Sequence, residues 1–442
     1  MLDPREIRIL QEALKTLSRG FDSLPEHPQD GDMTAIAAVL QDVAARMQDN
    51  FPYHHPRYAG QMLKPPHPVA RLAYALSLWL NPNNHALDGG RASSTMEKEC
   101  VAELARMFGF AESLGHLCGG GTMANLEALW VAGRLAPGRA IAASAQAHYT
   151  HARISDVLQL EFESVAVTPD GRMDIAVLEA LLEKDNVGTV VATLGTTGLG
   201  AVDPLPEILE LRDKHGFRVH VDAAYGGYFK LASETDEHVS DAFARVAEAD
   251  SIVVDPHKHG LQPYGCGCVL FRDPAVGALY RHDSPYTYFS SAELHLGEIS
   301  LECSRPGAAA VALWATQRLL PLVRGGEFAA GLDRSLRAAR KLWCRVAESS
   351  RYFTLAPPEL DIVVFGAAAA DAQSASARAR DVFARAAGEQ LYLALVDLPA
   401  GMVAPYRPEM HMNQPRITCL RSCLMKPEHD AAIDDIWRIL DG

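Results

Sequence analysis

The sequence predicts an α/β protein built on a mostly parallel sheet and followed by a smaller α+β region. Between Met96 and Asp273, short runs of Val, Ile and Ala alternate with segments of helical periodicity. Strands of nearly continuous apolar residues, separated by helices, are typical of parallel sheets that are buried on both faces. We expect strands at Ala140–Ser144, Val165–Thr168, Gly188–Leu194, Phe217–Val221, Ser251–Val254 and Cys268–Phe271.

Residues 1–95 are expected to form an N-terminal arm. Near the start of the arm, apolar residues recur at helical spacing, which gives one apolar stripe on a charged helix, at Ile7, Leu10, Leu14 and Leu17. From Pro25 to Ser94 the chain is rich in Pro, His and Asn and shows little periodicity, except for an apolar helix expected near Val69–Leu80. Loop-rich stretches of this kind often carry binding groups.

The rest of the chain is expected to form a large domain over residues 96–325 and a small C-terminal domain over residues 326–442. In the large domain, helices are expected at Met96–Phe108 and from the glycines before Thr122 through Arg134. A long helical stretch, Gly307–Leu322 and Gly326–Ser349, leads into the small domain. There we expect strands at Leu360–Phe365, Tyr392–Leu398 and Arg416–Cys423, and helices at Ala375–Ala387 and Glu428–Leu440.

Composition excludes several classes of protein. The 442 residues carry a formal net charge of −14, which argues against nucleic-acid and anionic-membrane partners, because both normally require a basic face. The apolar run Ala73–Leu80 is too short to span a bilayer, and the N-terminus lacks the pattern of a secretory signal, so a cytoplasmic location is expected. The eight cysteines lack zinc-site spacing, and we predict no metal.

Two strand ends carry charged residues. In open α/β sheets, ligands bind beyond the carboxyl ends of the strands. Asp222 ends one buried strand, where a carboxylate requires a cation or strong donors. The alternative is that Asp222 is only a helix cap or part of a structural ion pair. Another strand leads into Asp255-Pro256-His257-Lys258. A partly desolvated Lys258 is expected to act as an amine nucleophile toward a carbonyl; the alternative is a surface lysine between solvated histidines.

Two further motifs are weaker indications of a functional site when each is taken alone. Gly119-Gly120-Gly121-Thr122 opens a helix, so converging backbone N–H groups and the helix N-terminus can bind a phosphate, although such turns are often only turns. His148 follows a strand, where a structural histidine is the commoner case. Together, a phosphate cradle, a reactive lysine, a carboxylate and a stacking histidine are the parts required to hold pyridoxal phosphate.

The order of these motifs resembles the group II pyridoxal-phosphate amino-acid decarboxylases, the family of the glutamate, aromatic amino-acid, histidine and tyrosine enzymes. The resemblance runs from about His55 to the C-terminus. It implies the aspartate aminotransferase-type fold (fold type I), with a mostly parallel seven-stranded sheet flanked by helices and a small α+β C-terminal domain. It also implies pyridoxal 5'-phosphate as cofactor and a homodimer with shared active sites, in which a partner could cover the apolar stripe of the N-terminal helix.

The resemblance also assigns roles to residues. It implies that Lys258 forms the Schiff base, that Asp222 pairs with the pyridine nitrogen, and that His148 stacks on the ring above Ala224. The remaining cofactor contacts that it implies are Gly120, Gly121, Thr122, Thr196 and His257. The less specific outer matches suggest a substrate pocket at Tyr58, Gln61 and Arg421, although a structural salt bridge equally explains Arg421. His85 is added to this pocket because its polar segment lies where the family presents apolar or aromatic pocket residues.

The expected reaction is decarboxylation of an aromatic or acidic L-amino acid to the amine and CO2, through an external aldimine and a quinonoid. The segment that corresponds to a mobile loop in the family offers Tyr286 and Tyr288 as candidates for the tyrosine that governs protonation, unless these rings only pack. Aminotransferases, cysteine desulfurases and aldol-type lyases use the same lysine and aspartate, and the fold alone does not separate them. A non-catalytic cofactor-binding paralogue is a further alternative.

Overall fold

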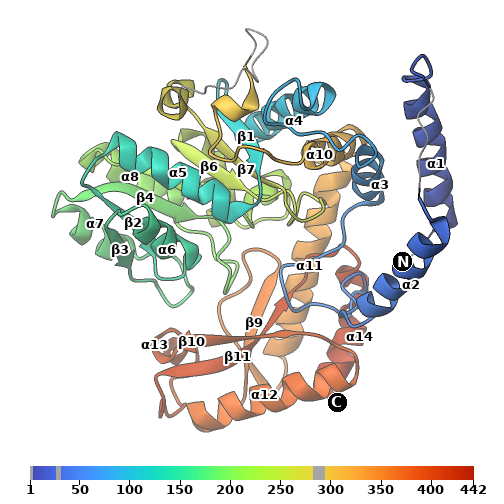
Figure 1. Ribbon diagram of the computed structural model, residues 1–442. Coiled ribbons are helices and arrows are strands. Elements are labelled where there is room, and N and C mark those ends of the chain that lie inside the picture. The colour runs from blue at the N-terminus through green and yellow to red at the C-terminus, as the bar shows by residue number, and fades with distance from the viewer. Residues whose placement is uncertain (1–2, 26–30, 282–293) are drawn as a thin grey trace.

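A computed structural model describes residues 3–25, 31–281 and 294–442 of the chain. It contains two sheets, a large one in the middle of the chain and a small one near the C-terminus (Figure 1). The strands of the large sheet are β1 (Leu114–Cys118), β2 (Ala140–Ser144), β3 (Phe162–Val165), β4 (Val187–Thr193), β5 (Arg218–Asp222), β6 (Ser251–Val254) and β7 (Gly267–Phe271).

The large sheet has the order β1-β7-β6-β5-β4-β2-β3. Its successive pairs from β3 to β6 are parallel, whereas β7 runs antiparallel to both β6 and β1. Every residue of β2, β4, β6 and β7 is buried, because helices cover the sheet on its faces. The helices of this part are α4 (Arg91–Phe108), α5 (Gly121–Leu135), α6 (Thr150–Val157), α7 (Ile175–Leu182), α8 (Leu205–His215), α9 (Glu237–Ala244) and α10 (Gly307–Leu319).

The long helix α11 (Glu327–Ala347) connects this part to the small sheet. The small sheet is antiparallel, in the order β10-β11-β9-β8. Its strands are β8 (Tyr352–Thr354), β9 (Ile362–Ala367), β10 (Ala394–Pro399) and β11 (Arg416–Cys423), and the helices around it are α12 (Ala372–Gly388), α13 (Ala400–Val403) and α14 (His429–Asp441). The predicted fold class is confirmed, while the exact domain boundaries stay predictions.

The N-terminal helices α1 (Pro4–Arg19) and α2 (Met33–Met47) lie at one side of the molecule (Figure 1). Helix α1 packs on α3 (Pro68–Ser77), where Arg71 pairs with Glu6 at 2.6 Å, and Leu10, Leu14 and Leu17 are partly buried. The predicted stripe is therefore partly covered by the chain itself. Every residue of helix α2, by contrast, is exposed.

Some local predictions were wrong. Helix α2 lies inside the stretch that we expected to be irregular, because Asp32 caps an Ala-rich segment whose flanking prolines masked its periodicity. Strands β1 and β8 were missed. In β1, Gly115 and His116 interrupt the apolar pattern, yet a Cβ on Gly115 would lie 2.6 Å from the carbonyl oxygen of Val269 on the neighbouring strand. Strand β3 begins three residues earlier than predicted and ends at Val165.

Candidate active site

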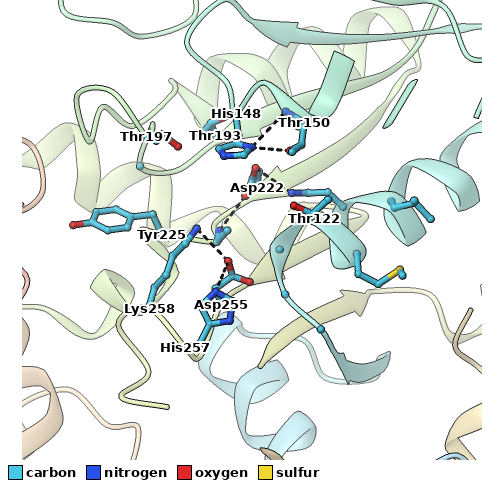
Figure 2. A pocket seen from close by; sticks show the side chains of 18 residues that line it. Thr122, His148, Thr150, Thr193, Thr197, Asp222, Tyr225, Asp255, His257 and Lys258 are labelled. Atoms are coloured by element: carbon cyan, nitrogen blue, oxygen red, sulfur yellow. Dashed lines mark hydrogen bonds and ion pairs between the residues drawn. The ribbon is translucent and has the colours of Figure 1, made fainter. Parts of the chain in front are cut away.

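A cavity of about 490 Å³ lies at the carboxyl ends of the parallel strands (Figure 2). This volume is within the usual range for small-molecule sites. Strands β5 and β6 lead directly into it, and the N-terminus of α5 faces it. The residues that line it are Gly119, Gly120, Gly121, Thr122, Met123, Asn125, Leu126, His148, Thr150, Thr193, Gly195, Thr197, Asp222, Ala224, Tyr225, Asp255, His257 and Lys258.

Asp222 is held at the end of β5 by several donors. Its Oδ2 accepts hydrogen bonds from His151 Nε2 at 2.8 Å and from Asn125 Nδ2 at 3.3 Å, and its Oδ1 accepts one from the Ala224 N–H at 3.1 Å. Burial by itself raises the pKa of Asp222, but the hydrogen bond from His151 and the positive charge of Lys258 outweigh it and hold the pKa below its ordinary value. Asp222 is therefore a buried carboxylate that stays ionised.

A second layer of hydrogen bonds fixes these donors. Asn125 Oδ1 accepts a hydrogen bond from His220 Nε2 at 2.8 Å, and His220 Nδ1 lies 2.8 Å from the Ser251 hydroxyl. Burial lowers the pKa of His220 to about 3, so this ring is neutral. A neutral His220 that donates from Nε2 orients the Asn125 amide so that its NH2 group points at Asp222.

Lys258 reaches into the cavity from the loop after β6 (Figure 2). Its Nζ lies 3.1 Å from Asp255 Oδ2, and its side chain is one-fifth exposed. Asp255 is buried, and its Oδ1 has no hydrogen-bond partner among the described residues. The amine is thus oriented by a carboxylate that keeps one oxygen available.

The glycines at the N-terminus of α5 form a close-fitting cradle. A Cβ on Gly121 would lie 2.7 Å from Asp255 Oδ2, and Gly120, at a φ of +148°, would bring its Cβ to 3.1 Å from His257 Cε1. Helix α5 has no side-chain cap, so its first N–H groups and its partial positive charge face the cavity. This geometry suits a phosphate group.

The ring of His148 is oriented by Thr150. His148 Nδ1 lies 2.7 Å from the Thr150 hydroxyl, and the ring is partly buried. Burial lowers the pKa of His148, and Lys258 lowers it further, while Asp222 opposes the shift. A neutral, fixed imidazole on the wall of the cavity can stack on a flat ring.

The structure brings together eight of the predicted site residues, namely Gly120, Gly121, Thr122, His148, Asp222, Ala224, His257 and Lys258. Thr196 does not line the cavity. Its hydroxyl accepts a hydrogen bond from the Ala201 N–H within a turn, and the neighbouring Thr197 lines the cavity instead.

The four predicted substrate residues do not line this cavity. Gln61 is exposed, and His85 lies 3.8 Å from Cys303 Sγ through its Nε2. The buried Tyr58 packs against other aromatic rings. Arg421 is buried on β11; its charge acts on Tyr225, and its Nε and Nη2 have no hydrogen-bond partner among the described residues. The loop tyrosines Tyr286 and Tyr288 lie outside the described residues.

Several lining or supporting residues were missing from the predicted set. Asp255 directly follows the apolar strand β6, so the signal that indicated Asp222 at the end of β5 was also available for Asp255. Asn125 belongs to the glycine-rich motif, which predicts a phosphate contact and does not indicate a hydrogen bond to Asp222. The contact between His151 and Asp222 depends on how α6 packs, and no sequence spacing indicates it.

These residues fit pyridoxal phosphate. The glycine cradle and the α5 N-terminus suit its phosphate, the ionised Asp222 suits a protonated pyridine nitrogen, and Lys258 is an amine in reach of the same cavity. Within the described residues, no group of three or more His, Cys, Asp or Glu side chains is arranged to hold a metal ion. Fold and site together define a fold type I pyridoxal-phosphate enzyme.

Comparison with known proteins identifies the family. Residues 24–368 match the family described as pyridoxal-dependent decarboxylase conserved domain. The chain is 29% identical over 410 residues to the L-tyrosine decarboxylase of Enterococcus faecium, an alignment that covers 70% of this chain and 67% of the relative. It is 30% identical over 316 residues to the probable L-tyrosine/L-aspartate decarboxylase of Methanothermobacter thermautotrophicus, covering 71% of this chain and 84% of the relative.

A solved structure agrees in fold. Oryza sativa TDC with PLP and tryptamine superposes with a TM-score of 0.79 at 19% identity, covering 100% of this chain and 98% of that one. The chain belongs to the pyridoxal-dependent decarboxylase family. It is a pyridoxal-phosphate-dependent amino-acid decarboxylase, and thus a carboxy-lyase. None of its described helices is long and apolar enough to cross a membrane.

Proposed function

We propose that this enzyme decarboxylates an aromatic or acidic L-amino acid to the amine and CO2, with Lys258 as the cofactor-binding lysine. One observation supports the proposal most directly: Lys258, Asp222 and His148 line one cavity that has a glycine cradle at its edge. When bound there, pyridoxal phosphate supplies a ring that accepts the electron pair left behind as a carboxylate departs.

Each residue of the cavity has a separate role in holding the cofactor. Asp222 holds the proton on the pyridine nitrogen, because its low pKa and its three donors keep it anionic. His148 would hold the cofactor ring by stacking on it. The N–H groups at the start of α5 bind the phosphate, while Asp255 orients the Lys258 amine.

Arg421 is the proposed anchor for a substrate carboxylate. A buried guanidinium without partners on two of its nitrogens is costly unless an anion completes its hydrogen bonds. Its charge also acts on Tyr225, which lines the cavity, so Arg421 lies within electrostatic reach of the site. We expect Arg421→Met to raise KM for the amino acid much more than it lowers kcat.

The test of substrate class is a panel assay of released CO2. L-tyrosine and L-aspartate come first, because relatives carry these names, followed by L-glutamate, L-tryptophan, cysteine sulfinate and diaminobutyrate. Stoichiometric CO2 and amine from one aromatic or acidic member supports the proposal. A keto acid, an aldehyde or sulfide as the main product from every member would contradict it.

Tyr286 and Tyr288 are proposed as alternative sources of the proton that the substrate carbon receives. Tyr286→Phe and Tyr288→Phe are compared by the ratio of amine formed to CO2 released. The variant that loses the true donor should release more CO2 than it forms amine, or lose turnover. Wild-type amine yield in both variants would contradict the proposal for both residues.

We further propose a homodimer. Helix α2 carries six large apolar side chains that are about half or more exposed, namely Met33, Ile36, Val39, Leu40, Val43 and Met47. A second copy of the chain can bury this face. Sedimentation should give a mass of two chains, and a single-chain mass at micromolar concentration would contradict the proposal. The expected cytoplasmic location stays a prediction.

A further inference from the structure

A second cavity, of about 320 Å³, lies apart from the residues that line the cofactor cavity. Its walls come from the N-terminal arm around Lys64, from the loop after Lys258, from α11 and from residues 426–428. The charged and titratable residues of its lining that matter here are Lys64, His259, Glu327, Arg334, Lys426 and Glu428.

Two lysines form the buried charged wall of this cavity. Lys64 is 8% exposed and Lys426 is 3% exposed. Lys64 Nζ donates to the Met425 carbonyl at 3.2 Å, and Lys426 Nζ donates to the Tyr58 carbonyl at 2.6 Å. An ammonium group has three protons to donate, so each lysine retains donors beyond its one carbonyl.

Neither ammonium has a carboxylate partner among the described residues. No ion pair joins Lys64 or Lys426 to an acid there; besides its hydrogen bond to the Tyr58 carbonyl, the ammonium of Lys426 lies 5.3 Å from the centre of the Tyr58 ring. The two lysines lie close enough for their charges to interact, and burial lowers the pKa of each to about 8. Two cations held together in a buried wall require an anion to compensate them.

The other charged groups around the cavity leave its interior positive. The acids that line it, Glu327 and Glu428, are exposed at its rim, as is Arg334. Asp361 also attracts Lys64, but its Oδ1 accepts a hydrogen bond from the Tyr225 hydroxyl and its Oδ2 lies 3.3 Å from His259 Nε2. His259 is 1% exposed, and its Nδ1 has no hydrogen-bond partner among the described residues.

We propose that this cavity is a binding site for a small oxyanion of the phosphate class, held by the ammonium groups of Lys64 and Lys426. The site does not depend on the decarboxylation chemistry, and the residues that line it are distinct from those of the cofactor cavity. Residues of the N-terminal arm and of the C-terminal part both contribute to it, so a bound oxyanion also ties the arm to the body of the enzyme.

The test is calorimetric titration of the holoenzyme with inorganic phosphate in buffer free of phosphate and sulfate. The cofactor occupies the glycine cradle in the holoenzyme, so that site does not contribute. Wild type should bind one phosphate per chain, and Lys64→Met and Lys426→Met should each weaken binding by about tenfold or more, as expected for loss of a charged donor. Sodium chloride in place of phosphate should give no comparable heat.

Lys230→Met is the matched control. Lys230 is also partly buried and donates to a backbone carbonyl, that of Phe243 at 2.8 Å, but it does not line this cavity. Its variant should bind phosphate as wild type does. Absence of saturable binding in the wild type, equal binding of chloride, or equal weakening in all three variants would overturn the proposal.

A second variant removes the risk that a buried substitution only unfolds the protein. Glu428 is exposed at the rim, and its charge reaches both lysines. Glu428→Gln removes repulsion from an incoming anion and should tighten phosphate binding about threefold or more, because nearby like charges disfavour the bound state. An affinity that is unchanged or weaker in this variant would contradict the site.

Discussion

The hydrogen bond from His151 to Asp222 supports a strong prediction. His151→Phe keeps an aromatic ring in a fully buried position but removes the donor that lies 2.8 Å from Asp222 Oδ2. A hydrogen bond to a charged group contributes about 1.5–3 kcal/mol, which corresponds to a rise of roughly one to two units in the pKa of the carboxyl. We therefore expect the free energy of unfolding of the apoenzyme at pH 7 to fall by about 1.5–3 kcal/mol.

The dependence on pH has a defined sign. The pKa of Asp222 in the folded protein lies below its ordinary value of 3.8, so its contribution to stability is present above pH 3.8 and is lost as the pH falls through the folded pKa. Loss of His151 raises that folded pKa. The stability gap between wild type and variant should be full at pH 7 and at pH 4, and should narrow only as the pH falls further, through the folded pKa of Asp222 in the variant and then in the wild type.

Urea unfolding at several pH values measures this gap. His238→Phe is the control, because His238 is partly buried and donates to a neutral backbone carbonyl, that of Val202 at 2.8 Å. Holoenzyme turnover gives a second readout. Each unit gained by the pKa of Asp222 weakens its hold on the pyridinium proton about tenfold, so kcat should fall accordingly. Equal stability and turnover in wild type and His151→Phe would refute this account of Asp222.

The remaining predictions concern the cradle, a buried histidine and the dimer. Gly121→Ala should weaken cofactor binding by about tenfold or more in a fluorescence titration, because its Cβ collides with a carboxylate that must stay in place, whereas Gly388→Ala, with open space, should not. Burial lowers the pKa of His429 to about 4 from 6.5, so its contribution to stability is lost as the pH falls below 6.5. Between pH 7 and pH 5, the free energy of unfolding measured in urea should therefore fall by about 2 kcal/mol less in His429→Gln than in wild type. Val43→Glu on the exposed face of α2 should shift sedimentation toward single chains, whereas Gln41→Glu on the same helix should not.

Sequence patterns predicted the elements whose formation is mainly local. Strands β2, β6 and β11 begin and end where predicted, since their apolar runs are bounded by polar or turn residues. Strand β1 was not predicted, because its Gly115 and its buried His116 contact β7 and Glu127. These contacts exist only in the folded sheet. Edge strands of this kind depend more on their neighbours than on their own composition.

In the candidate site, too, local sequence signals predicted some residues, and long-range packing determines the others. Lys258, Asp222 and the glycine cradle were predictable because a strand end or helix start fixes each of them directly. The choice between Thr196 and Thr197 was not, because it depends on which side of a turn faces the cavity. The oxyanion cavity joins residues more than 350 positions apart in the chain, and no local pattern marks Lys64 or Lys426 as neighbours.

The central claim is that Lys258 carries the cofactor in this cavity. The direct measurement is reduction of the holoenzyme with borohydride, followed by proteolysis and mass spectrometry of the lysine that retains the pyridoxyl group. We predict a single modified peptide containing Lys258, and no visible cofactor band in Lys258→Ala. A pyridoxyl group on another lysine, or an unchanged band in Lys258→Ala, would contradict the account.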